Sequence, residues 1–399
     1  MRTNVLIFAV LISTGLVLLA LPAFGTVYIV APDGSGDFPT IQDAIGFCTD
    51  GDVVELASGT FTGDGNRDVD FLGKAITVRS QNGDPALCVI DCEGSPAAPH
   101  RGFTFQSGES PASVLEGVTI IHGYGYLGLS IPGGGGVLCA ASSSPTFINC
   151  IFADNHAGMT FDHAGGGMYI DYYCDPSLQN CEFRANSAYF GGGLAVNHYS
   201  HATLENCLFI ANDAVRGGGV WGNSTAKLHC VFFGNTADFG GAVWNNGYNL
   251  DYSESCTYTH NSAAISGGGF QVEVGFGSPT QLVDSIIAFS PQGAAFGTNG
   301  VVAIFLSCSD LYGNAGGDWI GSIAGQVDLD GNFSANPCFC DVVAEDFRLC
   351  SDSWCLPGHH PWGCNQLVGA FDAGCGDCDC GGPVPTVPRS WGSLKALYH

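Results

Sequence analysis

The chain has 399 residues, of which 46% are hydrophobic and 59 are glycine, and its 11 Lys plus Arg against 37 Asp plus Glu give a formal net charge of −26. Such a surface repels nucleic acid, anionic membranes and polyuronates unless divalent cations bridge the charges. The composition therefore excludes nucleic acid as a partner and favours neutral glycans, proteins and cations.

Residues 1–25 have the features of a signal peptide. Arg2 precedes an apolar stretch from Val5 to Ala20, and the segment ends in a small-x-small pattern at 23–25. A retained membrane anchor is the alternative, but the apolar stretch is short for a span, and no later segment is long and apolar enough. We therefore expect an exported chain, secreted or at the cell surface, and the 19 Cys residues suit an oxidising compartment.

Residues 26–100 are predicted to form an N-terminal cap and the first coils of the fold. A short amphipathic helix is expected from about Thr40 to Cys48, because Ile41, Ala44 and Ile45 fall on the same face as Cys48. Such a helix would cover the open end of a stack of strands.

Residues 101–335 contain a five-fold repeat of an aromatic-x-x-Asn element followed by a glycine run. The repeated asparagines, spaced by 31, 26, 23 and 26 positions, are Asn155, Asn186, Asn212, Asn235 and Asn261. A unit of this length cannot fold alone, so neighbouring copies must stack as a solenoid. Apolar and polar residues alternate, which predicts short strands and an all-β parallel β-helix with one coil per repeat.

Two columns of side chains follow from this stacking. The asparagines should form an amide ladder in a turn where Asn tolerates left-handed geometry, and the glycine runs should form the next corner. A cysteine also recurs in each repeat, at Cys150, Cys181, Cys207, Cys230 and Cys256. These are expected to stack as small side chains, although disulfides between adjacent coils are the alternative.

The strand after each glycine run predicts a ligand-binding face. The first residues of these strands form a core ladder, namely Met168, Leu194, Val220, Val243 and Phe270, and alternation then points the next residues outward. The outward aromatic residues and their polar neighbours suit a sugar-binding platform, in which rings stack on sugar faces and polar groups meet hydroxyls. The predicted glycan platform comprises Tyr169, Asp171, Asn197, His198, Tyr199, Trp221, Asn223, Trp244, Asn246 and Glu273, with Tyr172, Tyr173 and His201 completing its rim. Duplication of the repeat could also align these residues without function.

Residues 336–380 are predicted to be a Cys-rich closing segment. Its cysteines, dense enough for a disulfide-stapled cap, are Cys338, Cys340, Cys350, Cys355, Cys364, Cys375, Cys378 and Cys380. A zinc site is the alternative, but no regular CxxC pair is present. Residues 381–399 form a Pro-rich linker and a short basic tail, which is either a sorting or docking tag or a disordered end.

No cofactor is assigned from the sequence. Two acidic segments, 64–68 and 328–332, offer oxygen ligands at short spacing, so calcium is a possible ligand there. Neither segment matches the EF-hand pattern, and solvated turns are the alternative. The scattered histidines show no metal-ligand spacing, and the sequence assigns no oligomeric state.

Three resemblances bear on the fold. The Phe-x-x-Asn and Gly-Gly-[Gly/Ala]-apolar elements over residues 130–270 resemble repeats of chlamydial-type polymorphic outer-membrane proteins, which implies a right-handed β-helix. Residues 30–45, with the segments 52–56 and 73–78, resemble the opening of pectin methylesterases and the wider pectin-lyase-like superfamily, which implies that the helix at 40–48 caps the β-helix. Residues 332–375 are similar to the closing segment of secreted bacterial parallel β-helix proteins.

The catalytic residues of that superfamily are not recognised here. The later methylesterase motifs and the Gly-His-Gly and Arg-Ile-Lys signatures of polygalacturonases have no counterpart, and the cations between residues 102 and 347 are only Arg184, Arg216 and Lys227. We therefore assign no catalytic residue and expect a non-catalytic protein that binds a glycan or another extracellular partner. The alternatives are a polysaccharide-degrading enzyme with a divergent site and a structural or adhesive surface protein.

Overall fold

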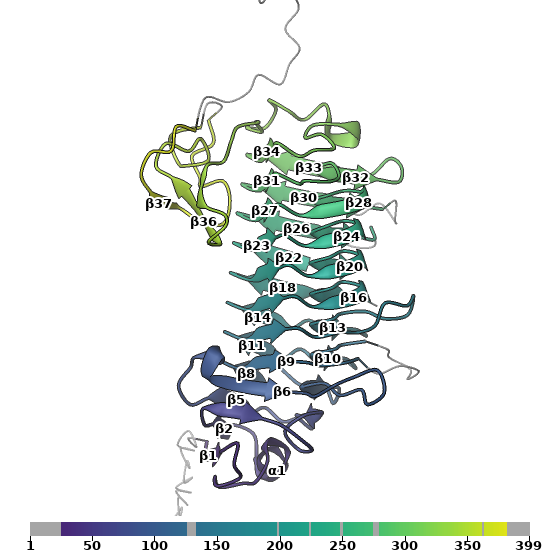
Figure 1. The fold of residues 1–399 in the computed structure, drawn as a ribbon, viewed down its shortest axis with the longest axis vertical. Coiled ribbons are helices and arrows are strands. Elements are labelled where there is room, and N and C mark those ends of the chain that lie inside the picture. The colour runs from purple at the N-terminus through teal and green to yellow at the C-terminus, as the bar shows by residue number, and fades with distance from the viewer. Residues whose placement is uncertain are drawn as a thin grey trace, which may run out of the picture.

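The computed structural model describes residues 25–125, 133–197, 199–222, 225–247, 250–273, 279–360 and 363–380. These residues form a parallel β-solenoid whose coils stack along one long axis, with a separate lobe at its side (Figure 1). The predicted all-β class and the parallel β-helix are thereby confirmed. The signal peptide and the basic tail lie outside the described residues, and the predicted domain limits stay predictions. Among the described residues, no helix has the length and apolar character needed to cross a membrane.

Short strands pair in register from coil to coil and build three long parallel sheets. Sheet 1 has 11 strands: β1 (Val27–Val30), β2 (Val53–Leu56), β5 (Thr77–Ser80), β8 (Val114–Glu116), β11 (Thr146–Ile148), β14 (Ser177–Gln179), β18 (Ala202–Glu205), β22 (Thr225–Leu228), β26 (Asp251–Glu254), β30 (Thr280–Val283) and β33 (Ile304–Ser307). Sheet 2 has 10 strands: β3 (Gly59–Phe61), β6 (Cys88–Asp91), β9 (Thr119–Ile121), β12 (Ile151–Ala153), β15 (Glu182–Arg184), β19 (Leu208–Ile210), β23 (Val231–Phe233), β27 (Thr257–Thr259), β31 (Ile286–Ala288) and β34 (Asp310–Tyr312). Sheet 3 has 9 strands: β4 (Val69–Asp70), β7 (Phe103–Phe105), β10 (Val137–Cys139), β13 (Met168–Ile170), β17 (Leu194–Val196), β21 (Val220–Gly222), β25 (Val243–Asn245), β29 (Phe270–Val272) and β32 (Phe296–Thr298).

A shorter fourth sheet lies between sheets 2 and 3 along the chain. Its strands are β16 (Ser187–Phe190), β20 (Asp213–Arg216), β24 (Thr236–Phe239) and β28 (Ser262–Ser266). Two short 3-10 helices, η1 (Pro85–Leu87) and η2 (Gly321–Ile323), lie outside the sheets. Each central coil therefore contains four strands.

The predicted N-terminal helix is present as α1 (Ile41–Phe47). Thr40 is its N-cap and accepts a hydrogen bond from the Asp43 backbone N–H, while Cys48 is its C-cap. Ile41, Ala44, Ile45 and Cys48 are buried in the core that continues through the coils. The helix covers the first coil, as Figure 1 shows at the lower end of the solenoid.

The asparagine ladder is confirmed and crosses the central coils without a break. Asn186 shows the pattern: its Nδ2 donates to Asn212 Oδ1 at 3.0 Å and to the Phe152 carbonyl at 2.8 Å, while its Oδ1 accepts from Asn155 N and Nδ2. The same bonds recur at Asn212 and Asn235. Each amide thus joins three successive coils.

The predicted backbone geometry of this ladder is wrong by one residue. The asparagines themselves are not left-handed; the positive φ falls on the residue before each of them, at Asp154, Ala185, Ala211, Gly234 and His260. The amide is therefore selected for its hydrogen bonds, since no left-handed backbone requires Asn at the ladder position. The first glycine of each glycine run does have positive φ, as predicted, for example 63° at Gly191.

The cysteine column is a row of free, buried thiols, so the stacking interpretation is confirmed over disulfides between coils. Beside it runs a column of parallel rings inside the core. Phe183 and Phe209 stack at 4.8 Å between centroids and Phe209 and Phe232 at 4.6 Å. These two columns and the amide ladder repeat the same contacts in each coil, which is how the stack buries the apolar side of every repeat.

The C-terminal segment forms a lobe that lies along the side of the solenoid. Its strands are β35 (Phe339–Asp341), β36 (Asp346–Cys350) and β37 (Ala373–Cys375), and Figure 1 shows them beside sheet 2, while the chain after β34 covers the end of the stack. Phe347 packs on Phe233 at 5.0 Å between ring centroids, and Glu345 forms a two-point ion pair with Arg184. The Ala370 N–H also donates to Thr257 Oγ1 at 3.0 Å.

Four disulfides staple this region, namely Cys308–Cys364, Cys338–Cys380, Cys340–Cys375 and Cys350–Cys378. The predicted disulfide-rich segment is therefore confirmed with one correction. Cys355 is free and buried, and Cys308, from the last coil, takes its place as the eighth paired cysteine. The Cys308–Cys364 bridge ties the lobe to the end of the solenoid.

Removal of one ladder amide should destabilise several coils. Asn212→Ala leaves the Phe183 carbonyl and the Asn186 N–H buried without partners, so we expect the free energy of unfolding to fall by about 3 kcal/mol or more. Urea unfolding would measure this. Asn82→Ala removes one exposed hydrogen bond to Ser58 and should change stability by less than about 0.5 kcal/mol. Equal effects of the two variants would contradict the structural role of the ladder.

Asp310 should make the contact between lobe and solenoid pH-dependent. Burial raises its pKa well above 3.8, although the Ala335 N–H and the Cys355 thiol donate to its carboxyl. Because the folded state binds this proton more tightly than the unfolded state, stability should be greatest below pH 3.8 and fall as the pH rises toward the folded pKa. Asp310→Asn should remove this dependence and be the more stable protein at neutral pH. Thermal unfolding across pH, with exposed Asp330→Asn as control, tests the sign.

Candidate ligand-binding face

The predicted register of sheet 3 is confirmed. The core ladder from Met168 to Phe270 pairs residue by residue, and so does the next row, Tyr169, Ala195, Trp221, Trp244 and Gln271. The aromatic residues of this second row belong to a separate apolar cluster outside the central core. They therefore point away from the core, as the alternation predicted.

The aromatic row is nevertheless buried, which corrects the expectation of an open platform. Trp221 and Trp244 stack at 5.6 Å between ring centroids, but they are only 8% and 4% exposed. Phe190 lies 4.8 Å from Trp221 between ring centroids, and the Arg216 guanidinium lies 5.0 Å from the Trp244 centroid. Both covering residues directly precede a glycine run, so the tight turn at the glycines folds them back over the strand that follows.

The polar row beside it is also largely withdrawn from solvent. Asp171 is buried and accepts from the Tyr169 hydroxyl at 3.0 Å, and Asn197 Nδ2 donates to that hydroxyl at 3.2 Å. Burial, reinforced by Asp171, raises the pKa of Tyr169, so this phenol stays protonated. Asn246 and Glu273 are half-buried. His198 and Asn223, the other two predicted platform residues, lie outside the described residues.

Glu273 interacts with Arg216 and with Trp244 of the aromatic row. Burial raises its pKa, and the Arg216 guanidinium and the Trp244 indole only partly offset this effect. The row from Asp171 to Glu273 spans four coils, or about 19 Å. That separation exceeds the 5 to 9.5 Å or so at which paired carboxylates cleave glycosidic bonds.

A group of exposed aromatic residues lies one turn further along the chain, where sheet 3 passes into sheet 1. We call Tyr172, Tyr173 and Tyr199 the tyrosine turn. Tyr173 and Tyr199 come from adjacent coils, and their rings are parallel within 11° at 5.3 Å between centroids. The three side chains are 43%, 60% and 66% exposed. Tyr199 belongs to the predicted platform, whereas Tyr172 and Tyr173 are predicted only at its rim, although the Asp-Tyr-Tyr-Cys and Asn-His-Tyr-Ser segments align one repeat apart.

All three tyrosines occupy a left-handed backbone conformation, with φ of 55°, 61° and 60°. This geometry costs a bulky residue about 1–2 kcal/mol. The equivalent turn of the preceding coil has the same geometry with Ala141 and Ser142, so the backbone does not require an aromatic residue. Neither the backbone nor burial accounts for tyrosine here, and such outliers point to a functional constraint.

The flank of the tyrosine turn is polar and acidic. His201 Nδ1 lies 3.0 Å from Asp175 Oδ1, and both side chains are exposed. The buried Asp171 carboxylate also accepts a hydrogen bond from the Tyr172 N–H at 3.0 Å, which stabilises the turn. The arrangement offers two parallel rings, phenol hydroxyls and a carboxylate–imidazole pair to a ligand.

The predicted calcium segments have other partners. Asp64 pairs with Arg67, and Asp68 Oδ2 lies 2.6 Å from His100 Nδ1. In segment 328–332, Asn332 Nδ2 donates to backbone carbonyls. Calcium binding at either segment stays a prediction.

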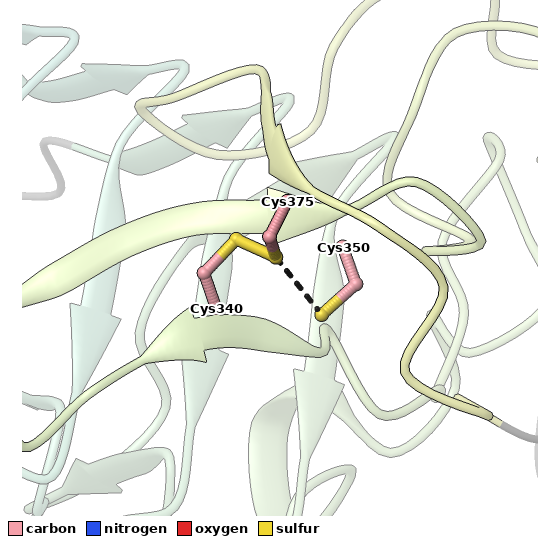
Figure 2. Close-up of side chains that lie close together, drawn as sticks. All are labelled: Cys340, Cys350 and Cys375. Carbon is pink, nitrogen blue, oxygen red and sulfur yellow. Dashed lines mark hydrogen bonds between the residues drawn. A yellow bond between two sulfur atoms is a disulfide. The ribbon is translucent and has the colours of Figure 1, made fainter.

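Sulfur atoms of the lobe lie close enough together to suggest a metal site. Among the described residues, Cys340, Cys350 and Cys375 form one such group, and Cys350 with Asp352 and Cys378 forms another. Figure 2 shows that Cys340 and Cys375 are joined, with Cys350 Sγ 3.5 Å from Cys375 Sγ. Because every cysteine of these two groups is paired, neither group has a thiolate to offer a metal.

Comparison with known proteins agrees with this architecture, which defines a right-handed parallel β-helix protein. A family described as the right handed beta helix region matches residues 75–295, more than half of the chain, and the protein belongs to that family. No curated protein matches the sequence.

The solved structures to which the chain is similar include a pectate lyase and two pectin methylesterases. The pectate lyase Pel9A is 14% identical, with 88% of this chain and 98% of that chain covered and a TM-score of 0.44. The pectin methylesterase from carrot is 14% identical, covering 78% and 88% with a TM-score of 0.36, and that from Aspergillus niger is 14% identical, covering 74% and 87% with a TM-score of 0.30. Likenesses this distant carry no inference about activity.

Stability measurements should separate the buried row from the tyrosine turn. Trp221→Ala removes a buried indole that packs on Trp244 and Phe190, so we expect a loss of about 3–5 kcal/mol. Tyr199→Asn should stay within about 1 kcal/mol of wild type, because relief of the left-handed backbone offsets the lost ring contact. Urea unfolding of both variants checks this. A loss above about 3 kcal/mol for Tyr199→Asn would instead make the tyrosine a structural residue.

Proposed function

We propose that this protein is an exported, non-catalytic β-helix protein that binds a neutral glycan through the tyrosine turn. The observation that carries the proposal is the pair of parallel, exposed rings of Tyr173 and Tyr199 in backbone conformations that disfavour them. Aromatic faces of this kind stack on the apolar faces of sugars, and the adjacent hydroxyls and the Asp175–His201 pair can bind sugar hydroxyls. Export rests on the predicted signal peptide.

The charges of the repeat region support a neutral ligand over a uronate. Three cations stand between residues 102 and 347, and all are engaged. Arg184 pairs with Glu182 and Glu345, Arg216 lies over Trp244, and Lys227 is buried in an ion pair with Asp251. A polyuronate would meet no free cation there and would face a net charge of −26.

Retention of the protein by immobilised neutral polysaccharides tests the proposal. We expect wild type to be retained by at least one of them without releasing reducing ends or unsaturated products. Tyr173→Ala/Tyr199→Ala should weaken retention about tenfold or more, because each stacked ring contributes on the order of 1 kcal/mol.

The matched control is Phe305→Ala, which removes an equally exposed ring from sheet 1 and should retain wild-type binding. Unchanged retention of the double tyrosine variant would place the ligand elsewhere. Cleavage of any polysaccharide by wild type would favour the alternative, a divergent polysaccharide-degrading enzyme. No retention on any polysaccharide would favour a structural or adhesive role.

A further inference from the structure

The C-terminal lobe contains an open pocket that is separate from the tyrosine turn. Its volume is about 440 Å³, and the described residues that line it are Asp352, Trp354, His359 and Asp379. Three of them follow β36 within nine residues, and Asp379 comes from the chain beyond β37. The pocket therefore forms only when these two segments are held together.

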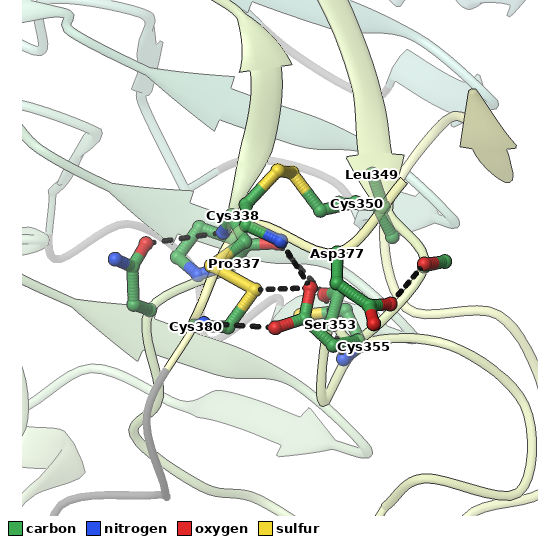
Figure 3. Close-up of a disulfide and its surroundings, with 12 residues drawn as sticks. Pro337, Cys338, Leu349, Cys350, Ser353, Cys355, Asp377 and Cys380 are labelled. Atoms are coloured by element: carbon green, nitrogen blue, oxygen red, sulfur yellow. Dashed lines mark hydrogen bonds between the residues drawn. A yellow bond between two sulfur atoms is a disulfide. The ribbon is translucent and has the colours of Figure 1, made fainter. Parts of the chain in front are cut away.

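Two disulfides hold the two segments together. Cys378 and Cys380 flank Asp379 in sequence and are bonded to Cys350 and Cys338, which precede Asp352, and Figure 3 shows Cys338, Cys350 and Cys380 in this part of the lobe. Asp352 joins the segments again, because its two carboxylate oxygens accept from the N–H groups of Cys378 and Cys380, both at 2.9 Å. The walls are thus fixed before any ligand arrives, which reduces the entropy lost on binding.

Asp352 is held as an anion. The backbone N–H of Cys380, then that of Cys378, donates to its carboxylate and lowers its pKa. Each carboxylate oxygen retains a lone pair after these bonds, so it can accept from a ligand as well. Asp379 adds a second carboxylate from a left-handed position with φ of 56°.

His359 and Trp354, the other two lining residues, also suit a positively charged ligand that donates hydrogen bonds. His359 Nδ1 lies 3.0 Å from the Ser353 carbonyl oxygen, which can only accept, so Nδ1 carries a proton, and in this tautomer Nε2 can accept from a ligand. The indole face of Trp354 attracts cations. The described lining contains no Lys or Arg. Both carboxylates of the pocket can therefore accept a hydrogen bond from a ligand.

We propose that this pocket binds a ligand through a primary ammonium group, which has three donors, no acceptor and a positive charge. Asp352 and Asp379 accept its N–H groups, and Trp354 packs against the adjoining carbons or the ammonium itself. Two sources share this chemistry, the side chain of a lysine on a protein and the amino group of an amino sugar.

Calorimetric titration of the full, oxidised chain at low ionic strength tests the proposal. The probes are cadaverine, which mimics a lysine side chain, and glucosamine, with uncharged N-acetylglucosamine as the matched control ligand. We expect at least one amine to bind while N-acetylglucosamine does not. Tighter binding of cadaverine would assign the lysine source, and tighter binding of glucosamine the amino sugar.

Variants separate the pocket from general attraction to an acidic protein. Asp379→Asn should weaken amine binding about fivefold or more, because it removes one charge-assisted contact. Asp372→Asn removes an exposed charge of the same lobe outside the pocket and should bind as wild type. Equal loss in both variants, or no loss in either, overturns the proposal, as does equal binding of glucosamine and N-acetylglucosamine. Trp354→Phe, with a thiol count to confirm that the disulfides have formed, should bind more weakly than wild type but more tightly than Trp354→Ala.

Discussion

The amide ladder is the interaction on which the rest of this structure depends. Asn186, Asn212 and Asn235 each bond to both neighbouring coils, so a coil cannot shift relative to the next without leaving buried amides and carbonyls unpaired. Apolar packing alone is not directional and would permit such a shift. The ladder therefore fixes the register between coils, so that each residue lies beside the equivalent residue of the next repeat.

This alignment also determines the geometry of the tyrosine turn. A single exposed tyrosine offers one face, whereas tyrosines at matching positions of two coils offer parallel rings at a spacing set by the strands. The lobe uses a different device for its pocket. There, disulfides and the Asp352 carboxylate join segments that no sheet aligns.

The sequence predicted the register of sheet 3, the amide ladder and the free thiol column. Stacking of the repeats places equivalent positions of successive coils next to one another. The sequence could not predict that Trp221 and Trp244 are buried, since alternation gives the direction of a side chain but not what folds over it. The cover comes from residues before the glycine run, and only the angle of that turn brings them back. The sequence could not show that Cys308 is paired and Cys355 is free. No local sequence pattern distinguishes the two, and only the fold places Cys308 next to Cys364.

The free thiol column has a consequence for how the chain oxidises. Eleven cysteines are unpaired and buried, and the eight that pair all lie at or beyond Cys308. Burial raises the pKa of Cys181, Cys207, Cys230 and Cys256, so these thiols of the folded column provide almost no thiolate to attack a disulfide. In the unfolded chain the same thiols compete with those of the lobe. Correct pairing then depends on the order of folding and oxidation. If the coils fold first, from the amino end, their thiols are buried before the disulfides of the lobe form.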